Sequence, residues 1–398
     1  MRTGRILAAI SVLALLLGGL SAAADSDDFS SEPDIDENAA AEYTDEISFT
    51  TLDRNEEARV TDGNMYSWQT IFESAEVTAE HPFTQLYLIW HDRPGEYTVS
   101  YDGGELACGE NGFLHELVTF PEPVSSIEIN CDDGWLCELR VFSEGTLPHD
   151  VQVWEPADGK ADVLVFPTHA DDDCLFFGAF IADAIDRGLS VQLAFLTVHA
   201  QGRHPGAFWD REHERLNGMW EMGLTRYPAS GGFPDYGADY VLTVASMFGV
   251  GKIEAWQVET IRRFRPEIIL CHDLNGEYGN NAHKVNARAL TAAIFSAADC
   301  TEYPGSFEEY GAWQAKKMYV HLSAGREIEL EVNAPLDAFG GRTAFEVAKD
   351  AYGWHESQHV WRNFQVRQDD KQYNCRRFGL AYSSVGPDTG NDYTENLY

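Results

Sequence analysis

Four side chains suited to catalysis or metal binding lie within five residues, just after a short apolar run at 163–166. A continuous apolar run of this length is typical of a strand buried on both faces. Apolar residues at helical spacing follow from Phe176 to Ile185, so a polar turn separates a strand from a helix. In open α/β folds such turns lie at the carboxyl edge of the sheet, where ligands bind. The four side chains are His169, Asp171, Asp172 and Asp173.

Two interpretations of this cluster stay open on spacing alone. The three aspartates fit the acidic first turn of a helix, where the macrodipole stabilises negative charge. That interpretation leaves His169 at the strand end unexplained. One imidazole and several carboxylates could instead hold a divalent metal ion and leave one carboxylate over to take a proton from water.

Two other predicted strand ends also carry polar clusters. One cluster spans 197–204 and continues into 211–214, and the other spans 272–283. Adjacent parallel strands would bring these ends together over one crevice. Two imidazoles and one carboxylate from the crevice would suit zinc and leave an open position for water. The predicted ligands are His169, Asp172 and His283, and the predicted general base is Asp171.

The elements that must position these residues alternate between strand and helix from residue 161 onward. This alternation predicts a three-layer α/β domain with a mainly parallel sheet, over 161–398. A linker rich in proline and glycine is expected at 146–160. Strands are expected at 163–166, 191–197, 267–270 and 318–322, and helices at 208–222, 282–298 and 343–355.

Residues 47–145 have a different pattern, with short strands and frequent turn signals that predict a smaller β-sandwich or jelly roll. The segments 60–68 and 139–142 loosely resemble galactose-binding-like modules of the coagulation factor 5/8 type. That resemblance implies a carbohydrate-binding module, and a purely structural β-domain is the alternative. Trp68, Trp90 and Trp135 would stack on a sugar in the first case and fill a core in the second. The strands are expected at 85–90, 96–101, 126–130 and 138–142.

The composition of the chain limits which classes of partner it can bind. The chain has 398 residues and a formal net charge of -37, from 65 acidic and 28 basic residues. Nucleic-acid binding is not expected, because contacts to phosphates need clustered lysine and arginine.

Residues 1–24, with two arginines before an apolar stretch and three alanines at its end, read as a cleaved secretory signal peptide. An acidic, disordered leader is expected at 25–46, and no second stretch is long enough to span a membrane.

Seven cysteines follow the predicted signal peptide. Export would permit disulfides. Cys131 and Cys137 flank a predicted turn and are the expected pair, with Cys300 and Cys375 a weaker candidate pair. Two further cysteines, Cys174 and Cys271, lie beside the predicted site and are expected to be packed thiols.

Several motifs in one order resemble a known family. His169-Ala-Asp-Asp-Asp173 resembles the His-Pro-Asp-Asp-(Asp/Glu) signature of the LmbE-like, or PIG-L, de-N-acetylases, and 276–283 resembles their Gly-Glu-Tyr-Gly-His-x-x-His motif. The resemblance covers nearly all of 160–398. It implies a Rossmann-like α/β fold, zinc as the cofactor and hydrolysis of an N-acetyl group on a glucosamine-type sugar. It implies that His169, Asp172 and His283 bind zinc, that Asp171 is the base, and that Arg211 and Asp235 contact the sugar.

The chain departs from the family pattern at two positions. Ala170 replaces the usual proline, which loosens the turn. Asn280 stands where the family has the first histidine of His-x-x-His, and an amide can donate a hydrogen bond to an oxyanion but cannot deliver a proton. Asn280 is therefore expected to be a catalytic hydrogen-bond donor. The histidines that could replace the missing acid, or serve structure alone, are His199, His272, His321 and His355.

The sequence thus predicts a secreted, zinc-dependent de-N-acetylase of N-acetylated sugars or glycans, acting outside the cell or at its surface. A glycan-binding protein that keeps the metal site but has lost catalysis is one alternative, given Asn280. Hydrolysis of another small amide is a second. Glu277 is expected either to contribute to the site or to shape the loop that presents His283. Glu214 is expected to hold Arg211 or touch substrate, and Ser357 to support the site from behind.

Overall fold

A computed structural model describes residues 36, 38–51, 59–198, 206–235, 240–322 and 327–397. The predicted signal peptide, most of the predicted acidic leader and His199 lie outside these ranges. Residues 39–398 form one compact unit. Within the described ranges, no helix combines the length and apolar character needed to cross a bilayer.

The α/β sheet is mixed and mostly parallel. In the described residues its strand order is β11-β12-β10-β9-β6-β7-β8, with β6 near the centre. The neighbours β10, β9, β6, β7 and β8 are parallel, and β12 runs antiparallel to β10 and β11. The strands are β6 (Val163–Phe166), β7 (Val191–Val198), β8 (Ala229–Pro234), β9 (Ile268–Cys271), β10 (Lys317–His321), β11 (Glu327–Glu329) and β12 (Arg377–Ser383).

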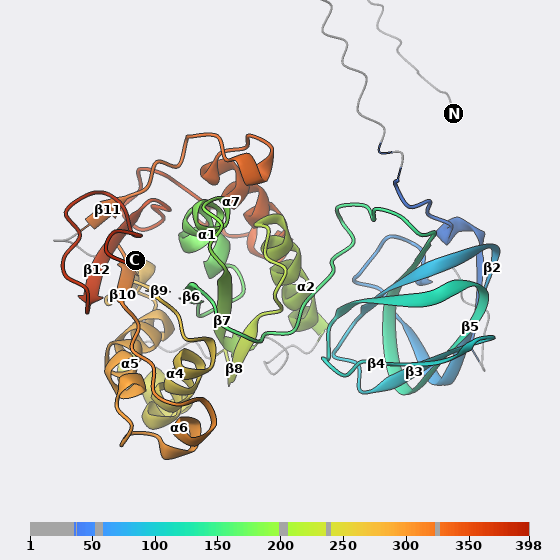
Figure 1. Cartoon of the computed structure of the whole chain (residues 1–398), viewed down its shortest axis with the longest axis horizontal. Helices are drawn as coiled ribbons and strands as arrows, with labels where there is room; N and C mark the ends of the chain where they lie inside the picture. The colour runs from blue at the N-terminus through green and yellow to red at the C-terminus, as the bar shows by residue number, and fades with distance from the viewer. Residues whose placement is uncertain are drawn as a thin grey trace, which may run out of the picture. The chain divides into compact units, whose positions relative to one another are not determined.

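Helices cover both faces of this sheet (Figure 1). The helices α1, α2 and α7 lie on one face, and α4 and α5 lie on the other, with α3 and α6 packed beside them. The helices are α1 (Gly178–Asp186), α2 (Gly206–Glu221), α3 (Val241–Phe248), α4 (Val250–Phe264), α5 (Asn281–Ala298), α6 (Pro304–Tyr310) and α7 (Ala344–Gly353).

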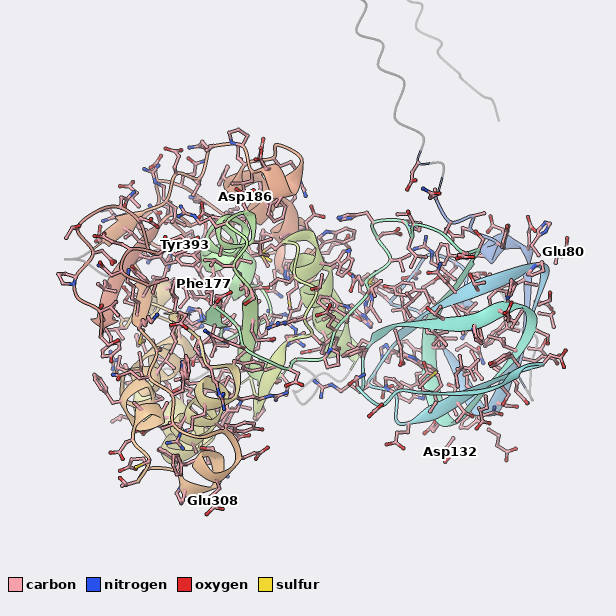
Figure 2. All side chains as sticks on the ribbon, viewed as in Figure 1. Glu80, Asp132, Phe177, Asp186, Glu308 and Tyr393 are labelled. Atoms are coloured by element: carbon pink, nitrogen blue, oxygen red, sulfur yellow. The ribbon has the colours of Figure 1, made fainter. Side chains whose placement is uncertain are left out.

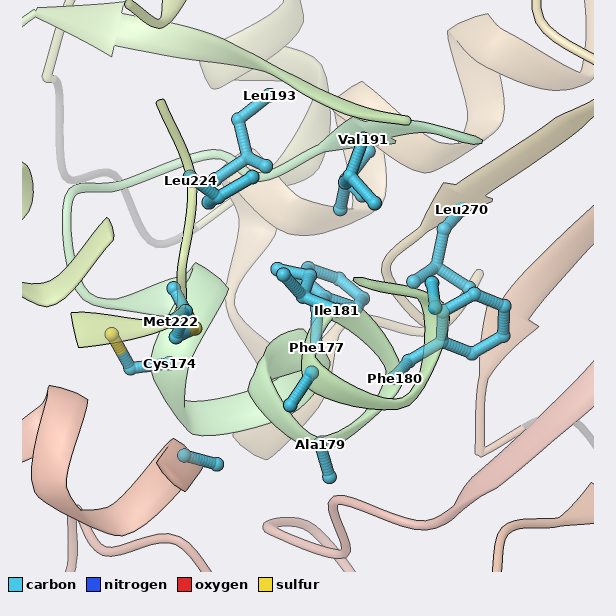
Figure 3. Close-up of a cluster of buried hydrophobic side chains, with 14 of the residues drawn as sticks. Cys174, Phe177, Ala179, Phe180, Ile181, Val191, Leu193, Met222, Leu224 and Leu270 are labelled. Atoms are coloured by element: carbon cyan, nitrogen blue, oxygen red, sulfur yellow. The ribbon is translucent and has the colours of Figure 1, made fainter. Parts of the chain in front are cut away.

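The inner strand β6 shows why the sequence folds this way. Val163 and Val165 pack into the core with α1 and α7, while Leu164 and Phe166 pack into the core with α4 and α5. A strand covered on both faces needs apolar residues at every position, which is the continuous pattern seen in the sequence. On the α1 side, Phe177 and Phe180 fill the space above the sheet beside Leu270 (Figure 3).

The N-terminal sheet has the order β1-β2-β5-β3-β4 in the described residues. The paired residue numbers of β2 and β5 run in opposite directions, so the strands are antiparallel. Residues 85–89 pair with both 115–119 and 138–142, because the long β5 folds back to flank β2 on two sides. The strands are β1 (Ile47–Thr51), β2 (Gln69–Trp90), β3 (Tyr97–Tyr101), β4 (Gly104–Cys108) and β5 (His115–Phe142).

The strands predicted at 85–90, 126–130 and 138–142 are confirmed as strand residues, but they belong to the longer strands β2 and β5, because the turn signal Asp133-Gly134 lies inside β5 and does not end it. The expected cysteine pairing is wrong. The seven cysteines are free, so neither predicted pair forms. Cys131 packs in the same cluster as Trp90, whereas Cys137 packs in a separate cluster with Tyr87. Cys300 is exposed, while its proposed partner at position 375 is buried.

The acidic composition is carried on the surface. The labelled side chains of Glu80, Asp132 and Glu308 are exposed and project outward, while Phe177 and Tyr393 lie inside (Figure 2). Carboxylates that stay in water cost little to keep charged, and they favour solubility without deciding the fold. The acids that matter for chemistry are the few buried ones.

Candidate metal centre

Two neighbouring strands bring the predicted metal ligands together. Strands β6 and β9 are parallel and paired to their last residues, Phe166 with Cys271, so the chain leaves both at the same edge. His169 follows β6, and the loop after β9 leads into α5, which carries His283. The side chain of Asn286 on α5 donates to the carbonyl of Phe166, and so ties this helix to the end of β6.

His169, Asp172 and His283 converge on one point. Nδ1 of His169 lies 3.0 Å from Nε2 of His283. Both nitrogens face Oδ2 of Asp172, at 3.1 Å for His169 and 3.2 Å for His283. All three side chains are buried. The fold therefore collects two imidazole nitrogens and one carboxylate oxygen from segments more than a hundred residues apart.

This donor set fits zinc. Ligand bonds of 2.0–2.2 Å in a tetrahedral site separate neighbouring ligand atoms by roughly 3.3 Å. The observed separations of 3.0 to 3.2 Å are close to that value. Two ring nitrogens that face each other at this distance cannot both carry a proton, and a shared cation removes the conflict. The remaining ring nitrogen of His283 meets a carboxylate, an arrangement common for metal-bound histidine.

That carboxylate belongs to Glu277, which organises the whole centre. Its Oε2 lies 2.8 Å from Nδ1 of His283 and 2.9 Å from Nδ1 of His272. Its Oε1 lies 2.8 Å from Nδ1 of His321 and accepts the backbone N–H of Asp273 at 3.0 Å. Burial alone would raise the pKa of Glu277, but the surrounding histidines hold it well below its usual value. Glu277 is therefore an ionised hub for three imidazoles, and its role is larger than shaping a loop.

The local backbone explains how Glu277 reaches this place. Gly276 has φ +69°, and a Cβ there would lie 2.3 Å from the carbonyl oxygen of Asn280, so the turn needs glycine. Tyr278 has φ +42°, a left-handed conformation that is unfavourable for a bulky side chain. Strain of this kind persists where surrounding contacts over-determine the loop, as they do around a functional site.

Asp171 lies beside the centre but outside the ligand set. Its Oδ1 accepts a hydrogen bond from Nη2 of Arg211 at 2.9 Å. Burial raises the pKa of Asp171, although Arg211 acts in the opposite direction. A carboxyl group that is held in place by one cation, with a raised pKa, is suited to take up a proton and release it again.

Asp235 and Arg211 occupy the partly exposed side of the centre. Asp235 follows β8, and its Oδ1 lies 3.5 Å from Nε2 of His169. Its side chain is 30% exposed, whereas that of Asp172 is 2% exposed. Burial disfavours charge on His169, but Asp235 and Asp172 outweigh this and raise its pKa to about 10. The centre is thus reached from the side where Asp235 and Arg211 lie.

Asn280 has a clear structural task. Its Oδ1 accepts the backbone N–H groups of Ala282 at 2.8 Å and His283 at 3.3 Å, and so caps the start of α5. Asparagine is a preferred N-cap residue because its side chain satisfies amides that a helix start leaves free. The amide nitrogen of Asn280 lies 3.4 Å from the hydroxyl of Tyr278. The cap fixes the first turn of the helix that presents His283.

The described histidines that could replace the missing acid already have partners of their own. His321 pairs with Glu277 through Nδ1 and with the carbonyl of Asn374 through Nε2, at 2.6 Å. Nε2 of His272 accepts the backbone N–H of Thr168 at 3.0 Å. His355 is buried, with Nε2 3.6 Å from Sγ of Cys174, and burial lowers its pKa to about 3.

Glu214 binds Ser357 in a loop that is distant in the sequence. Its two carboxylate oxygens accept the backbone N–H of Ser357 at 2.7 Å and its hydroxyl at 2.6 Å. Glu214 lies one helical turn after Arg211 on α2. The spacing Arg211-x-x-Glu214 was visible in the sequence, but the partner, 143 residues away, was not.

A second buried group lies behind the centre. Possible metal-ligand atoms of Asp173, Cys174 and His355 lie within 4.8 Å of one another, and all three residues are buried. Burial raises the pKa of Asp173 well above its usual value. Burial therefore favours the neutral form of Asp173, which lies in the interior and is not one of the three predicted ligands.

Comparisons with known proteins agree with this geometry. Residues 164–294 match the family model for PIG-L, GlcNAc-PI de-N-acetylase. A 1D-myo-inositol 2-acetamido-2-deoxy-alpha-D-glucopyranoside deacetylase of Rhodococcus erythropolis is 26% identical over 181 residues, 39% of this chain and 59% of that protein. A mycothiol S-conjugate amidase of Streptomyces coelicolor is 37% identical over 78 residues, 19% of this chain and 26% of that protein. The chain thus spans less than two thirds of the length of these curated relatives.

Solved structures show weaker similarity. An N,N'-diacetylchitobiose deacetylase from Pyrococcus horikoshii matches with a TM-score of 0.43 and 13% identity, over 55% of this chain and 84% of that one. A conserved protein from Thermus thermophilus matches with a TM-score of 0.40 and 19% identity, over 57% of this chain and 97% of that one. The strand order given above, and not this similarity, defines the fold. The match to the family model for PIG-L, GlcNAc-PI de-N-acetylase, at residues 164–294 covers all three predicted ligands.

Proposed function

We propose that the protein is a zinc-dependent de-N-acetylase that removes the acetyl group from a GlcNAc-type sugar or glycan. The observation that carries this proposal is the convergence of His169, Asp172 and His283 on one point, with Asp171 beside it and outside the set. The family match and the deacetylases among the relatives support the same reaction.

The chain's residues divide the chemistry between them. His169, Asp172 and His283 would hold zinc, which when bound polarises the acetyl carbonyl and lowers the pKa of a water molecule. Asp171 takes the proton from the attacking water and passes it to the departing amine, as one carboxyl group that acts first as base and then as acid. Arg211 keeps Asp171 in position, and together with Asp235 it contacts the sugar at the partly exposed side.

Asn280 affects how the amine receives its proton, and it is the reason to consider a glycan-binding protein without catalysis as the alternative. Because its Oδ1 caps α5, Asn280 has only its amide nitrogen left, which lies beside the Tyr278 hydroxyl and can donate a hydrogen bond but not a proton. Delivery of the proton therefore depends on Asp171 alone. If the protein has lost catalysis, it would be a glycan-binding protein with a retained metal site.

The decisive experiment measures acetate release from a panel of N-acetylated sugars and glycans, with zinc-loaded protein and with protein treated with a chelator. We expect release that the chelator abolishes and that added zinc restores. Glycan binding without acetate release across the panel would establish the alternative. Release that is unaffected by the chelator would refute the zinc mechanism.

We further propose that the protein is exported and acts outside the cell or at its surface. The support is the basic start at Arg2 and Arg5, the apolar stretch at 6–20 and the small residues at 22–24. Determination of the N-terminus of protein recovered from the medium or the cell surface tests this, and a mature start near Asp25 is expected. An intact N-terminus in the cytosolic fraction would contradict it.

A further inference from the structure

A row of aromatic rings leads from the metal centre to the surface. The Tyr278 ring lies 5.5 Å from that of His283, and the Phe364 ring lies 5.4 Å from that of Tyr278. The Trp361 ring lies 6.4 Å from that of Phe364. Tyr373 stacks on Tyr278 at 5.9 Å and supports the row from behind. These four side chains, Tyr278, Tyr373, Phe364 and Trp361, are called the aromatic row below.

The outer end of the aromatic row is exposed to solvent. Trp361 is 60% exposed and its neighbour Val360 is 74% exposed, whereas Tyr373 is 6% exposed. Trp361 is held on one side by Phe364 and leaves the rest of its ring open to solvent. Tryptophan is enriched at contact surfaces because its ring is apolar and its N–H can stay in water.

The loop that carries Trp361 is fixed relative to the catalytic groups. Ser357 is held by both oxygens of Glu214, and the backbone N–H of Trp361 donates to the carbonyl of Gln358 at 3.0 Å. Glu214 lies one helical turn from Arg211, which binds Asp171. One helix thus sets the positions of both the proposed base and the Trp361 loop.

We propose that Trp361 and Phe364 form a stacking subsite for a second sugar residue, so that the substrate is an oligosaccharide or polysaccharide and not a single sugar. This inference rests on the proposed deacetylase function. A sugar whose acetamido group reaches the metal centre would lie along Tyr278, and Trp361 stands two ring contacts farther out. The apolar C–H face of the next sugar would pack on the rings, while its hydroxyls stay in water. The strongly negative protein suits a neutral glycan better than a polyanion.

The first test compares acetate release from free GlcNAc and from a β-1,4-linked GlcNAc tetramer. The variants are wild type, Trp361→Ala, Trp361→Phe and the control Phe295→Ala. Phe295 is also 60% exposed, and its ring contacts Tyr382, not the aromatic row. We expect wild type to prefer the tetramer in kcat/KM and Trp361→Ala to reduce that preference by about tenfold, mainly through KM, since aromatic contacts are worth up to about a factor of ten. Trp361→Phe should keep most of the preference, and Phe295→Ala all of it.

The outcomes separate this inference from the proposed function. If wild type releases acetate equally well from both substrates, or if Trp361→Ala behaves like Phe295→Ala, the subsite does not exist although the deacetylase stands. If neither substrate releases acetate, the deacetylase proposal loses its support, and calorimetric binding of the tetramer decides the subsite. Binding that Trp361→Ala weakens and Phe295→Ala does not would support the subsite. Absence of tetramer binding would overturn it.

Discussion

Replacement of Glu277 by glutamine should weaken metal binding without unfolding the protein. The shape of the side chain is kept, but the charge is lost and one oxygen becomes an N–H₂ donor. In the wild type, Oε2 accepts Nδ1–H of His283 at 2.8 Å, which leaves Nε2 unprotonated and free to bind zinc. An amide nitrogen in that place would favour the other tautomer, with the proton on Nε2, the ligand atom. The zinc site would then have to expel a proton before it could form.

The expected size follows from the contacts. Loss of a group that orients a metal-bound histidine costs about 10- to 100-fold in affinity. This corresponds to roughly 1.4 to 2.7 kcal/mol. Glu277 serves His272 and His321 as well as His283, so the upper end of this range is expected.

The assay is a zinc titration against a competing chelating dye, with circular dichroism to confirm folding and acetate release measured at saturating zinc. A matched control is Glu267→Gln, which removes a partly buried carboxylate that pairs with Lys160 and Lys316 and touches no predicted ligand. Glu277→Gln should bind zinc at least tenfold more weakly than this control. If a folded Glu277→Gln protein binds zinc as tightly as wild type, the tautomer argument is refuted.

Three further predictions concern single side chains. Asp171→Asn should keep its zinc and lose acetate release by about 10²-fold or more, and equal turnover at equal zinc content would contradict its role as base. Asn280→His should raise turnover, because it restores a group that can deliver a proton, but it should lower the thermal midpoint, because the cap of α5 is worth about 1 kcal/mol. The variant Asn280→Ala measures the loss of the cap alone. Unchanged turnover in the histidine variant would argue against a missing acid. Burial raises the pKa of Glu138 from 4.5 to about 7, so its contribution to stability is complete below about pH 4.5 and is lost as the pH rises through 7. Glu138→Gln should remove about 3 kcal/mol of that decline, at about 1.4 kcal/mol per pKa unit, seen as a smaller fall in the urea midpoint between about pH 4 and pH 8. Parallel midpoints in the two proteins would refute this prediction.

The sequence pattern predicted secondary structure well where an element is covered on both faces and is therefore apolar throughout. The strand at 163–166 was predicted at its observed bounds, because an inner parallel strand is apolar at every position. The helix predicted at 282–298 begins one residue earlier, at Asn281. Strand β8 and helices α3, α4 and α6 were not predicted. Ala229–Pro234 contains two glycines and lacks an apolar period, so nothing local marks it as a strand before it pairs with β7.

The sequence by itself determined the set of reactive groups, since residue types and their order along the chain are properties of the covalent polymer. His169, Asp171, Asp172 and His283 could be named from their places after apolar runs. Tertiary structure alone decided which partners the supporting residues meet. Glu277 joins three imidazoles, and Glu214 meets Ser357 at a separation of 143 residues. No local pattern encodes such contacts, because they form only when the sheet and its covering helices place distant segments side by side.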